Sequence, residues 1–180
     1  YVRGHAEDFN RWSKTGLPKW SYKYVLPYFK KLETSLEKES QYRGKNGPLL
    51  VSKSKVNEKF PLFQAALNAA VEAGYTISED FNGYMQDGFG TYDVTIKDGT
   101  RIGASKAYLE ETKQRKNVDI FIKTNVQKIL FENLKAIGIQ VSIKGKLENI
   151  YANKEVIVAS GSINSPKLLQ LSGIGDEQEL

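Results

Sequence analysis

The segment 161–175, which reads GSINSPKLLQLSGIG, has the residues of a glycine turn, a capped helix and a glycine that ends the helix. It follows an apolar, β-branched run at 155–160 that predicts a short buried strand. Asn164 or Ser165 can accept hydrogen bonds from the free N–H groups of a first helical turn, and Pro166 suits the first helical position. The positive end of such a helix lies at the edge of a sheet, where phosphate-bearing cofactors commonly bind. On these residues alone, an ordinary βα unit is the favoured interpretation.

The residues before this segment predict a β-meander. From residue 118 onward the hydrophobic period is two, which is typical of half-buried strands. The predicted strands are 118–122, 126–131, 136–143 and 150–151, and they lead into the strand 155–160. Gly173 or Gly175 is expected to end the final helix in a left-handed conformation.

The first 113 residues predict short helices separated by glycine-rich loops and single strands. Asp8 lies where a short helix can begin, and Ser21 is placed to cap a second helix that runs toward Glu39, with its regular part after Pro27. The other predicted elements are a strand at 49–51, a helix at 58–74 closed by Gly74, a loop at 80–90, a strand at 92–96, a turn at 98–99 and a helix at 104–111.

The composition excludes several classes of function. Lysines and arginines exceed acidic residues by five, but they are scattered among glutamates and aspartates and flank no nucleic-acid motif, so we expect no nucleic-acid partner. No run approaches the roughly 20 apolar residues that span a bilayer. The absence of cysteine and the single histidine argue against disulfides and a resident metal site. Both ends look internal, so we expect a segment of a longer protein.

The segment 161–175 resembles the second sequence signature of the glucose–methanol–choline (GMC) oxidoreductases, a family of FAD-dependent alcohol oxidases and dehydrogenases. The similarity extends in order over essentially all 180 residues. It includes YVRG at 1–4, LPYFKK at 26–31, GPL at 47–49, DFNG at 80–83 and QDGFG at 86–90. Within the family, the sequence of residues 60–84 is most similar to those of bacterial choline dehydrogenases.

The resemblance implies an α/β fold with α+β insertions. Part of an FAD-binding Rossmann-type domain, with a β-meander, would be interleaved with part of a substrate-binding domain. Residues 1–57 would cover the flavin, residues 58–113 would begin the substrate-binding domain, and residues 114–180 would return to the FAD domain.

The resemblance also implies three cofactor-binding residues. The backbone amide and carbonyl of Val126 would read the adenine edge of FAD, and Ser160 and Gly161 would lie where the chain passes close to the cofactor. Without a cofactor role, Val126 would be a core strand residue, and Ser160 and Gly161 a tight strand-to-helix turn. The catalytic histidine and its partner are expected outside residues 1–180, as is the Gly-x-Gly-x-x-Gly fingerprint. Arg3 is a candidate partner for a phosphate or a buried carboxylate, and the sequence does not choose between them.

The implied activity of the parent protein is oxidation of a small-molecule alcohol at its CH–OH group, with choline converted to betaine aldehyde by hydride transfer to FAD. The segment alone is expected to be inactive. Oxidation of another alcohol or a sugar, or a non-catalytic remnant of the fold, would also be consistent with these residues. The resemblance implies a cytoplasmic enzyme with peripheral association at the inner face of the membrane. It leaves open the electron acceptor, the covalent attachment of FAD and the oligomeric state.

Overall fold

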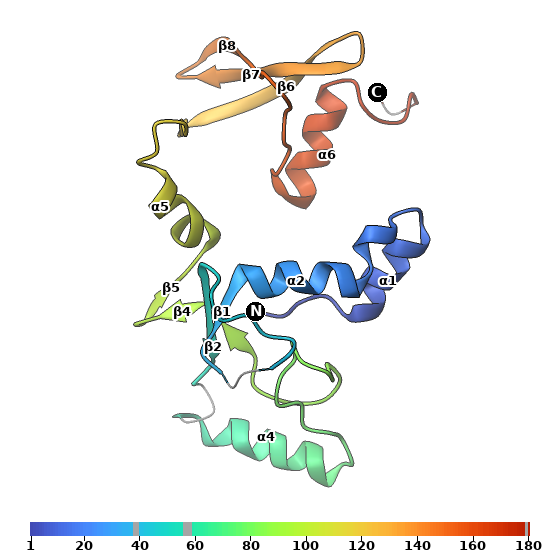
Figure 1. Cartoon of the computed structure of the whole chain (residues 1–180), viewed down its shortest axis with the longest axis vertical. Coiled ribbons are helices and arrows are strands. Elements are labelled where there is room, and N and C mark those ends of the chain that lie inside the picture. Colours follow the sequence, from blue (N-terminus) through green and yellow to red (C-terminus); the bar gives the residue numbers. More distant parts are fainter. Residues whose placement is uncertain (38–39, 56–58, 179) are drawn as a thin grey trace. The chain divides into compact units, whose positions relative to one another are not determined.

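The computed structural model describes residues 1–37, 40–55, 59–178 and 180. The chain contains both helices and strands and divides into two compact units, Tyr1–Val118 and Asp119–Leu180 (Figure 1). The predicted mixed α/β class is therefore confirmed.

The first unit opens with three short helices that pack through aromatic rings. They are α1 (Ala6–Lys14), the 3₁₀ turn η1 (Pro18–Trp20) and α2 (Tyr22–Leu32). Phe9 is buried, and its ring centroid lies 5.5 Å from that of Phe29 and 5.4 Å from that of Trp12, both edge-on. Such edge-to-face pairs stabilise helix contacts beyond the area that they bury.

The start of α1 gives the single histidine a structural role. His5 Nδ1 accepts a hydrogen bond from the Glu7 N–H at 3.2 Å, and Asp8 Oδ2 accepts one from the His5 N–H at 3.0 Å. This reciprocal arrangement is a capping box, which satisfies two N–H groups that the helix itself cannot. His5 is exposed and belongs to the helix start.

The predicted cap of α2, Ser21, is confirmed, but the regular part of the helix and its end differ from the prediction. The regular part does not begin after Pro27, because the helix already begins at Tyr22 and includes the proline. The proline removes only one N–H donor, a cost that the packed helix tolerates. The helix also stops at Leu32, because Glu33 adopts extended backbone angles and enters a strand. Glu39, the predicted end, lies outside the described residues.

A small sheet organises the first unit. Strand β1 (Glu33–Ser35) pairs in parallel with β2 (Leu49–Lys53), and β3 (Asp93–Val94) pairs with β2 in antiparallel fashion. Val51 on the central strand is fully buried. The predicted strand at 49–51 is confirmed by β2.

The predicted strand at 92–96 appears as two short strands. They are β3 and β4 (Ile96–Lys97), and β4 forms a hairpin with β5 (Thr100–Arg101). Asp98 and Gly99 connect the hairpin with φ values of 48° and 71°. Two positive φ angles are the signature of a tight hairpin turn, so the predicted turn is confirmed.

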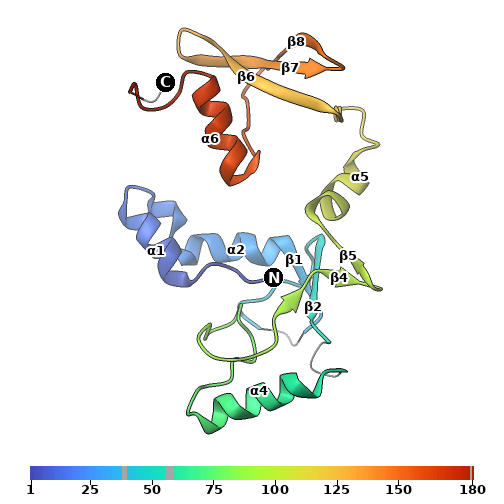
Figure 2. The ribbon, with the colours of Figure 1, turned by 180° about the vertical axis from the view of Figure 1, so that it is seen from behind.

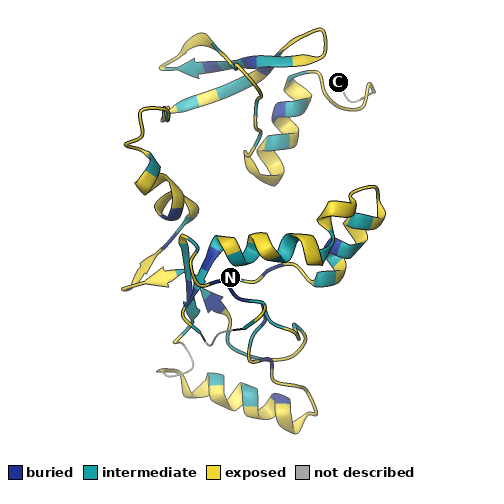
Figure 3. Cartoon of the chain, viewed as in Figure 1, coloured by how far each residue is buried: buried dark blue, intermediate teal, exposed yellow. Residues whose placement is uncertain are grey.

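The remaining helices of this unit lie near the surface. Helix α4 (Pro61–Glu72) ends just before Gly74, whose φ is 84°, as predicted, whereas the predicted start at residue 58 lies outside the described residues. Figure 3 shows α4 mostly in the exposed colour, and Ala70 is its buried residue. The predicted helix at 104–111 is confirmed as a wide π-helical turn, η2 (Ser105–Leu109), followed by α5 (Glu110–Thr112).

The second unit contains the predicted meander and the final helix (Figure 2). Strands β6 (Thr124–Glu132), β7 (Lys135–Ile143) and β8 (Lys146–Tyr151) pair in antiparallel order. Helix α6 (Gly161–Leu171) is tied to β6 at Ser172. The Ser172 hydroxyl accepts a hydrogen bond from the Ile129 N–H at 2.8 Å and donates one to the Leu168 carbonyl at 2.6 Å.

Two predicted strands are wrong for this chain. Residues 118–122 and 155–160 pair with no described strand, and Ile122 is 76% exposed. The burial predicted for 155–160 is also absent, because Ile157 is 80% exposed. A continuous apolar run like that at 155–160 is typical of parallel strands that are covered on both faces. Such a run becomes a buried strand only where neighbouring strands are present to pair with it.

Candidate cofactor site in the C-terminal unit

The start of α6 differs from the prediction. The helix begins at Gly161 with Ser160 as its cap residue, so Pro166 lies inside the helix and not at its first position. Ser165 does act as a hydrogen-bond acceptor, since its Oγ receives the Ser160 N–H at 3.0 Å. The glycine allows this earlier start, because its φ of 87° reverses the chain directly into the helix.

The end of α6 is as predicted. Gly173 has a φ of 80°, and the Ile174 N–H donates to the Leu169 carbonyl at 3.0 Å. This pattern satisfies carbonyls of the last turn and is typical of a glycine helix stop.

One face of α6 and the first residues of β6 enclose a small cavity. Its volume is about 280 Å³, and its lining consists of Thr124, Asn125, Val126, Ser160, Asn164, Lys167, Leu168 and Leu171. The helical members recur every three to four residues, so they share one stripe of α6. The lining combines buried Leu168 with residues that carry hydroxyl, amide and ammonium groups.

The strand that borders this cavity, β6, has backbone donors and acceptors on its outer edge. Strand β6 is the edge of its sheet, and the bond from the Ile129 N–H to Ser172 shows that its outer side meets α6. The register with β7 also shifts between Val126 and Lys128. A bulge of this kind disrupts the ladder locally, which leaves backbone donors and acceptors for other partners.

The composition of the cavity fits one portion of a dinucleotide cofactor. Small-molecule sites usually have volumes of roughly 300–1,000 Å³, so this cavity has space for a part of such a ligand and not for the whole. Apolar lining beside a strand edge suits a flat base, and the polar lining groups suit sugar and phosphate groups. The sequence contains no Gly-x-Gly-x-x-Gly turn, so the pyrophosphate cradle is not among these residues.

The structure brings two of the three predicted cofactor residues together. Val126 and Ser160 line the same cavity although 34 positions separate them in the sequence (160 minus 126). Gly161 is the next residue but is not part of the lining. A Cβ atom on Gly161 would meet nothing within 4 Å, so its positive φ is what requires glycine in this chain. The cofactor roles of all three residues stay predictions.

We expect Gly161→Ala to lower the free energy of unfolding of the second unit by about 1–2 kcal/mol, because an L-residue is strained at this φ. Gly161→Asn should cost less, since asparagine adopts left-handed angles more readily. Urea denaturation followed by circular dichroism measures both. The matched control is Gly175→Ala in the same unit, where φ is not in the left-handed region and the added methyl group would make only ordinary contacts at 3.6 Å. Equal stability of Gly161→Ala and the unmodified protein would contradict the strain argument.

The first unit holds a buried charge cluster that the sequence analysis missed. We define it as Arg3, Glu33, Arg43, Asp80, Asp93 and the partly exposed Lys53. Glu33 is fully buried and lies 2.8 Å from both Arg3 Nη2 and Arg43 Nε. Arg43 Nη1 also lies 2.8 Å from carboxylate oxygens of Asp80 and Asp93. Three positive and three negative groups balance, which is the condition for burying charges.

Arg43 is the centre of this cluster. Burial by itself would lower the pKa of its guanidinium, but the hydrogen bond to Glu33 and the charges of Asp93, Glu33 and Asp80 raise that pKa above its usual value. The cluster joins the N-terminal residues, β1, the β1–β2 connection, the loop at 80–83 and β3. Its members come from distant parts of the sequence, so local patterns could not reveal it. Of the two candidate partners for Arg3, the buried carboxylate is therefore the one observed.

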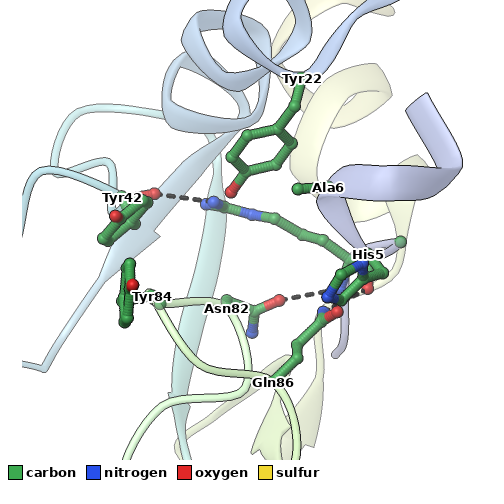
Figure 4. Close-up of a pocket in the computed structure, with 10 residues that line it drawn as sticks. His5, Ala6, Tyr22, Tyr42, Asn82, Tyr84 and Gln86 are labelled. Carbon is green, nitrogen blue, oxygen red and sulfur yellow. Dashed lines mark hydrogen bonds between the residues drawn. The ribbon is translucent and has the colours of Figure 1, made fainter. Parts of the chain in front are cut away.

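A second cavity, of about 210 Å³, lies beside this cluster (Figure 4). Its polar groups bond to one another. Asn82 Oδ1 accepts the Arg3 N–H at 2.8 Å, Arg3 Nη1 donates to the Tyr42 carbonyl at 2.7 Å, and Gln86 Nε2 donates to the Arg3 carbonyl at 2.9 Å. Burial raises the pKa of the Tyr22 phenol, against the opposing effect of Arg3. These bonds serve the fold, because they tie Arg3 to Tyr42, Asn82 and Gln86, which are distant in the sequence.

Comparisons with known proteins identify the family of this chain. The family model for GMC oxidoreductases matches residues 1–180. The chain belongs to the GMC oxidoreductase family. The resemblance carried by the motifs is thereby confirmed over the full length, including the segment that forms α6.

The curated relatives of this GMC chain include choline dehydrogenases. It is 46% identical over all 180 residues to the mitochondrial choline dehydrogenase of Homo sapiens, and 47% identical to the oxygen-dependent choline dehydrogenase of Rhizobium meliloti. The corresponding value for the Photobacterium profundum protein of the same name is 42%. The chain spans 30–32% of the length of these relatives.

Two solved structures are similar to this chain. Pyridoxine 4-oxidase from Mesorbium loti matches with a TM-score of 0.90 at 28% identity, over 99% of this chain and 35% of that protein. An FAD-dependent oxidoreductase from Chaetomium thermophilum also has a TM-score of 0.90, at 32% identity, over 99% of this chain and 33% of that protein. The predicted likeness to an FAD-binding Rossmann-type region agrees with these neighbours.

Proposed function

We propose that this chain is part of an FAD-dependent oxidoreductase that acts on the CH–OH group of choline. The observation that supports the proposal most is identity of 42–47% over all 180 residues to proteins named choline dehydrogenase. The cavity between α6 and β6 adds a site whose size and lining suit one portion of the cofactor.

In this proposal the residues of the chain bind and position. The backbone of Val126 pairs with the adenine edge, and Ser160 and Gly161 let the chain pass close to the cofactor. Residues 1–57 cover the flavin, residues 58–113 begin the substrate-binding domain, and residues 114–180 belong to the FAD domain. When bound, FAD accepts the hydride from the alcohol carbon. The base that removes the hydroxyl proton is a histidine outside residues 1–180.

A second candidate is oxidation of a different alcohol. A solved neighbour with a TM-score of 0.90 is a pyridoxine 4-oxidase, so an aromatic primary alcohol could be the substrate on the same fold. A sugar substrate is a third candidate, and a non-catalytic remnant of the fold is a fourth. The electron acceptor and the oligomeric state are not part of the proposal.

The test uses the full-length protein and a panel of alcohols. Purified protein should carry FAD, and turnover with an artificial electron acceptor should be much faster with choline than with pyridoxine or glucose. A preference for pyridoxine or glucose would overturn choline as the substrate but keep the reaction class. Bound FAD without turnover of any alcohol would favour the non-catalytic remnant.

We also infer a cytoplasmic enzyme that touches the inner face of the membrane peripherally. Although basic residues are scattered among acidic ones over most of the chain, residues 9–32 contain six lysines and arginines and no acidic residue. Trp12 and Trp20 in this stretch are about half exposed, as is typical of interfacial surfaces. No described helix is long and apolar enough to cross a bilayer.

Vesicle sedimentation tests this membrane contact. The full-length protein should sediment with vesicles that contain anionic lipid, and much less with neutral ones or at high salt. Replacing Lys19, Lys23 and Lys31 by glutamine should weaken this binding. Equal sedimentation of the triple variant and the unmodified protein would contradict it.

A further inference from the structure

Lys167 places a positive charge at the edge of a cavity. It lies on the stripe of α6 that lines the 280 Å³ cavity, one turn after Asn164. The side chains of Lys167 and Asn164 form no hydrogen bond or ion pair with any residue that the structure describes. The side chain of Asn125, on β6, also has no such partner within the described part of the chain.

In the cavity of Figure 4, by contrast, the charged side chain already has a partner. There the charged group, Arg3, is already neutralised by Glu33 at 2.8 Å, and Asn82 and Gln86 bond to the backbone. In that cavity the positive charge is therefore already paired with a buried carboxylate. The cavity of α6 and β6 presents one positive charge and two amides, together with the apolar surface of Leu168.

We propose that Lys167 binds a phosphate group of the adenylate half of the cofactor, with Asn164 donating beside it. The inference rests on the proposed function, because it assumes that this cavity holds the adenosine portion of FAD. An ammonium group is a flexible point charge with three donors, which suits a phosphate at the rim of a site. Asn125, at the start of β6, lines the same cavity and can bond to the sugar.

The inference adds a residue-specific expectation to the backbone contact at Val126. The backbone contact at Val126 recognises the adenine base and involves no charged group, whereas Lys167 recognises the charge of the phosphate. The two contributions are separable, because adenosine has the base and the sugar but no phosphate.

The experiment measures binding to the flavin-depleted full-length protein. FAD is titrated by flavin fluorescence, and ADP and adenosine are then measured by competition with FAD. Lys167→Gln should weaken FAD and ADP binding about fivefold at low salt, as expected for a partly exposed charge pair, and leave adenosine binding unchanged. Added salt should reduce FAD affinity less steeply in this variant than in the unmodified protein. Lys167→Arg, which keeps the charge, should restore most of the lost affinity.

The control is Lys146→Gln, which removes an exposed lysine of the same unit that does not line the cavity. It should bind all three ligands normally. Unchanged ADP affinity in Lys167→Gln, or an equal loss for ADP and adenosine, would overturn the inference and leave the proposed function standing. If the unmodified protein binds no FAD at all, the proposed function fails together with the inference.

Discussion

Replacing Glu33 by glutamine is expected to lower the free energy of unfolding of the first unit by about 3–5 kcal/mol, the usual cost of breaking a buried ion pair. Glu33 is fully buried and accepts hydrogen bonds from Arg43 Nε at 2.8 Å and from the Gly44 N–H at 3.0 Å. It is also the observed counter-charge of Arg3. Glutamine has nearly the same shape, so the loss measures charge and not packing. Arg3 would then keep its full charge in a buried place.

Trp12 and Trp20 provide the measurement, because both tryptophans of the chain lie in the first unit. Urea denaturation followed by their fluorescence should show an earlier midpoint for Glu33→Gln. The control is Glu111→Gln, which changes the same group at an exposed position of the same unit. A difference below about 1 kcal/mol between the two variants, the ordinary size of an exposed ion pair, would mean that the cluster is not a major source of stability.

The second large effect is expected for Gly44→Ala. A Cβ atom at Gly44 would lie 1.8 Å from the Lys30 carbonyl oxygen and 2.8 Å from that of Glu33. Both contacts are with backbone, which cannot rotate away, so the β1–β2 connection must move from the end of α2. That movement would also disturb the bonds from the Ser35 N–H to the Gly44 carbonyl and from the Gly44 N–H to Glu33. We expect a loss of about 3 kcal/mol or more in the free energy of unfolding.

The same alanine substitution at Gly103 is the control, since its added methyl group meets nothing within 4 Å. Urea midpoints of the two variants give the comparison directly. If Gly44→Ala unfolds at the same urea concentration as Gly103→Ala, then the close approach of the connection to α2 is not a constraint on the fold.

Elements whose information is local could be predicted from the sequence. The alternating run that forms β6 and β7 needs only a neighbouring hairpin strand, and Gly74 and Gly173 end their helices through their own φ angles. The starts of α2 and α6 could not be predicted from their prolines. Once the surrounding turn is packed, a proline in the second turn removes a single hydrogen bond.

Features that depend on distant residues were predicted poorly. Nothing near Arg43 indicates that Asp93, 50 positions away, will bond to it. The alternating run at 118–122 and the apolar run at 155–160 predict strands, but strand formation depends on neighbours that the described chain does not supply. Of the candidate site, Val126 and Ser160 came from the family resemblance. Asn164 was predicted only as a residue of the helix start, and Lys167 was not predicted at all; both line the cavity because α6 lies beside β6.

The most direct test of the proposed function is anaerobic mixing of the full-length protein with choline while the flavin absorbance is recorded. A CH–OH oxidoreductase of this kind should lose its oxidised flavin spectrum as the alcohol is consumed, and choline deuterated at the hydroxyl-bearing carbon should slow that loss. A flavin that stays oxidised with choline, pyridoxine and glucose alike would contradict alcohol oxidation as the function of this protein.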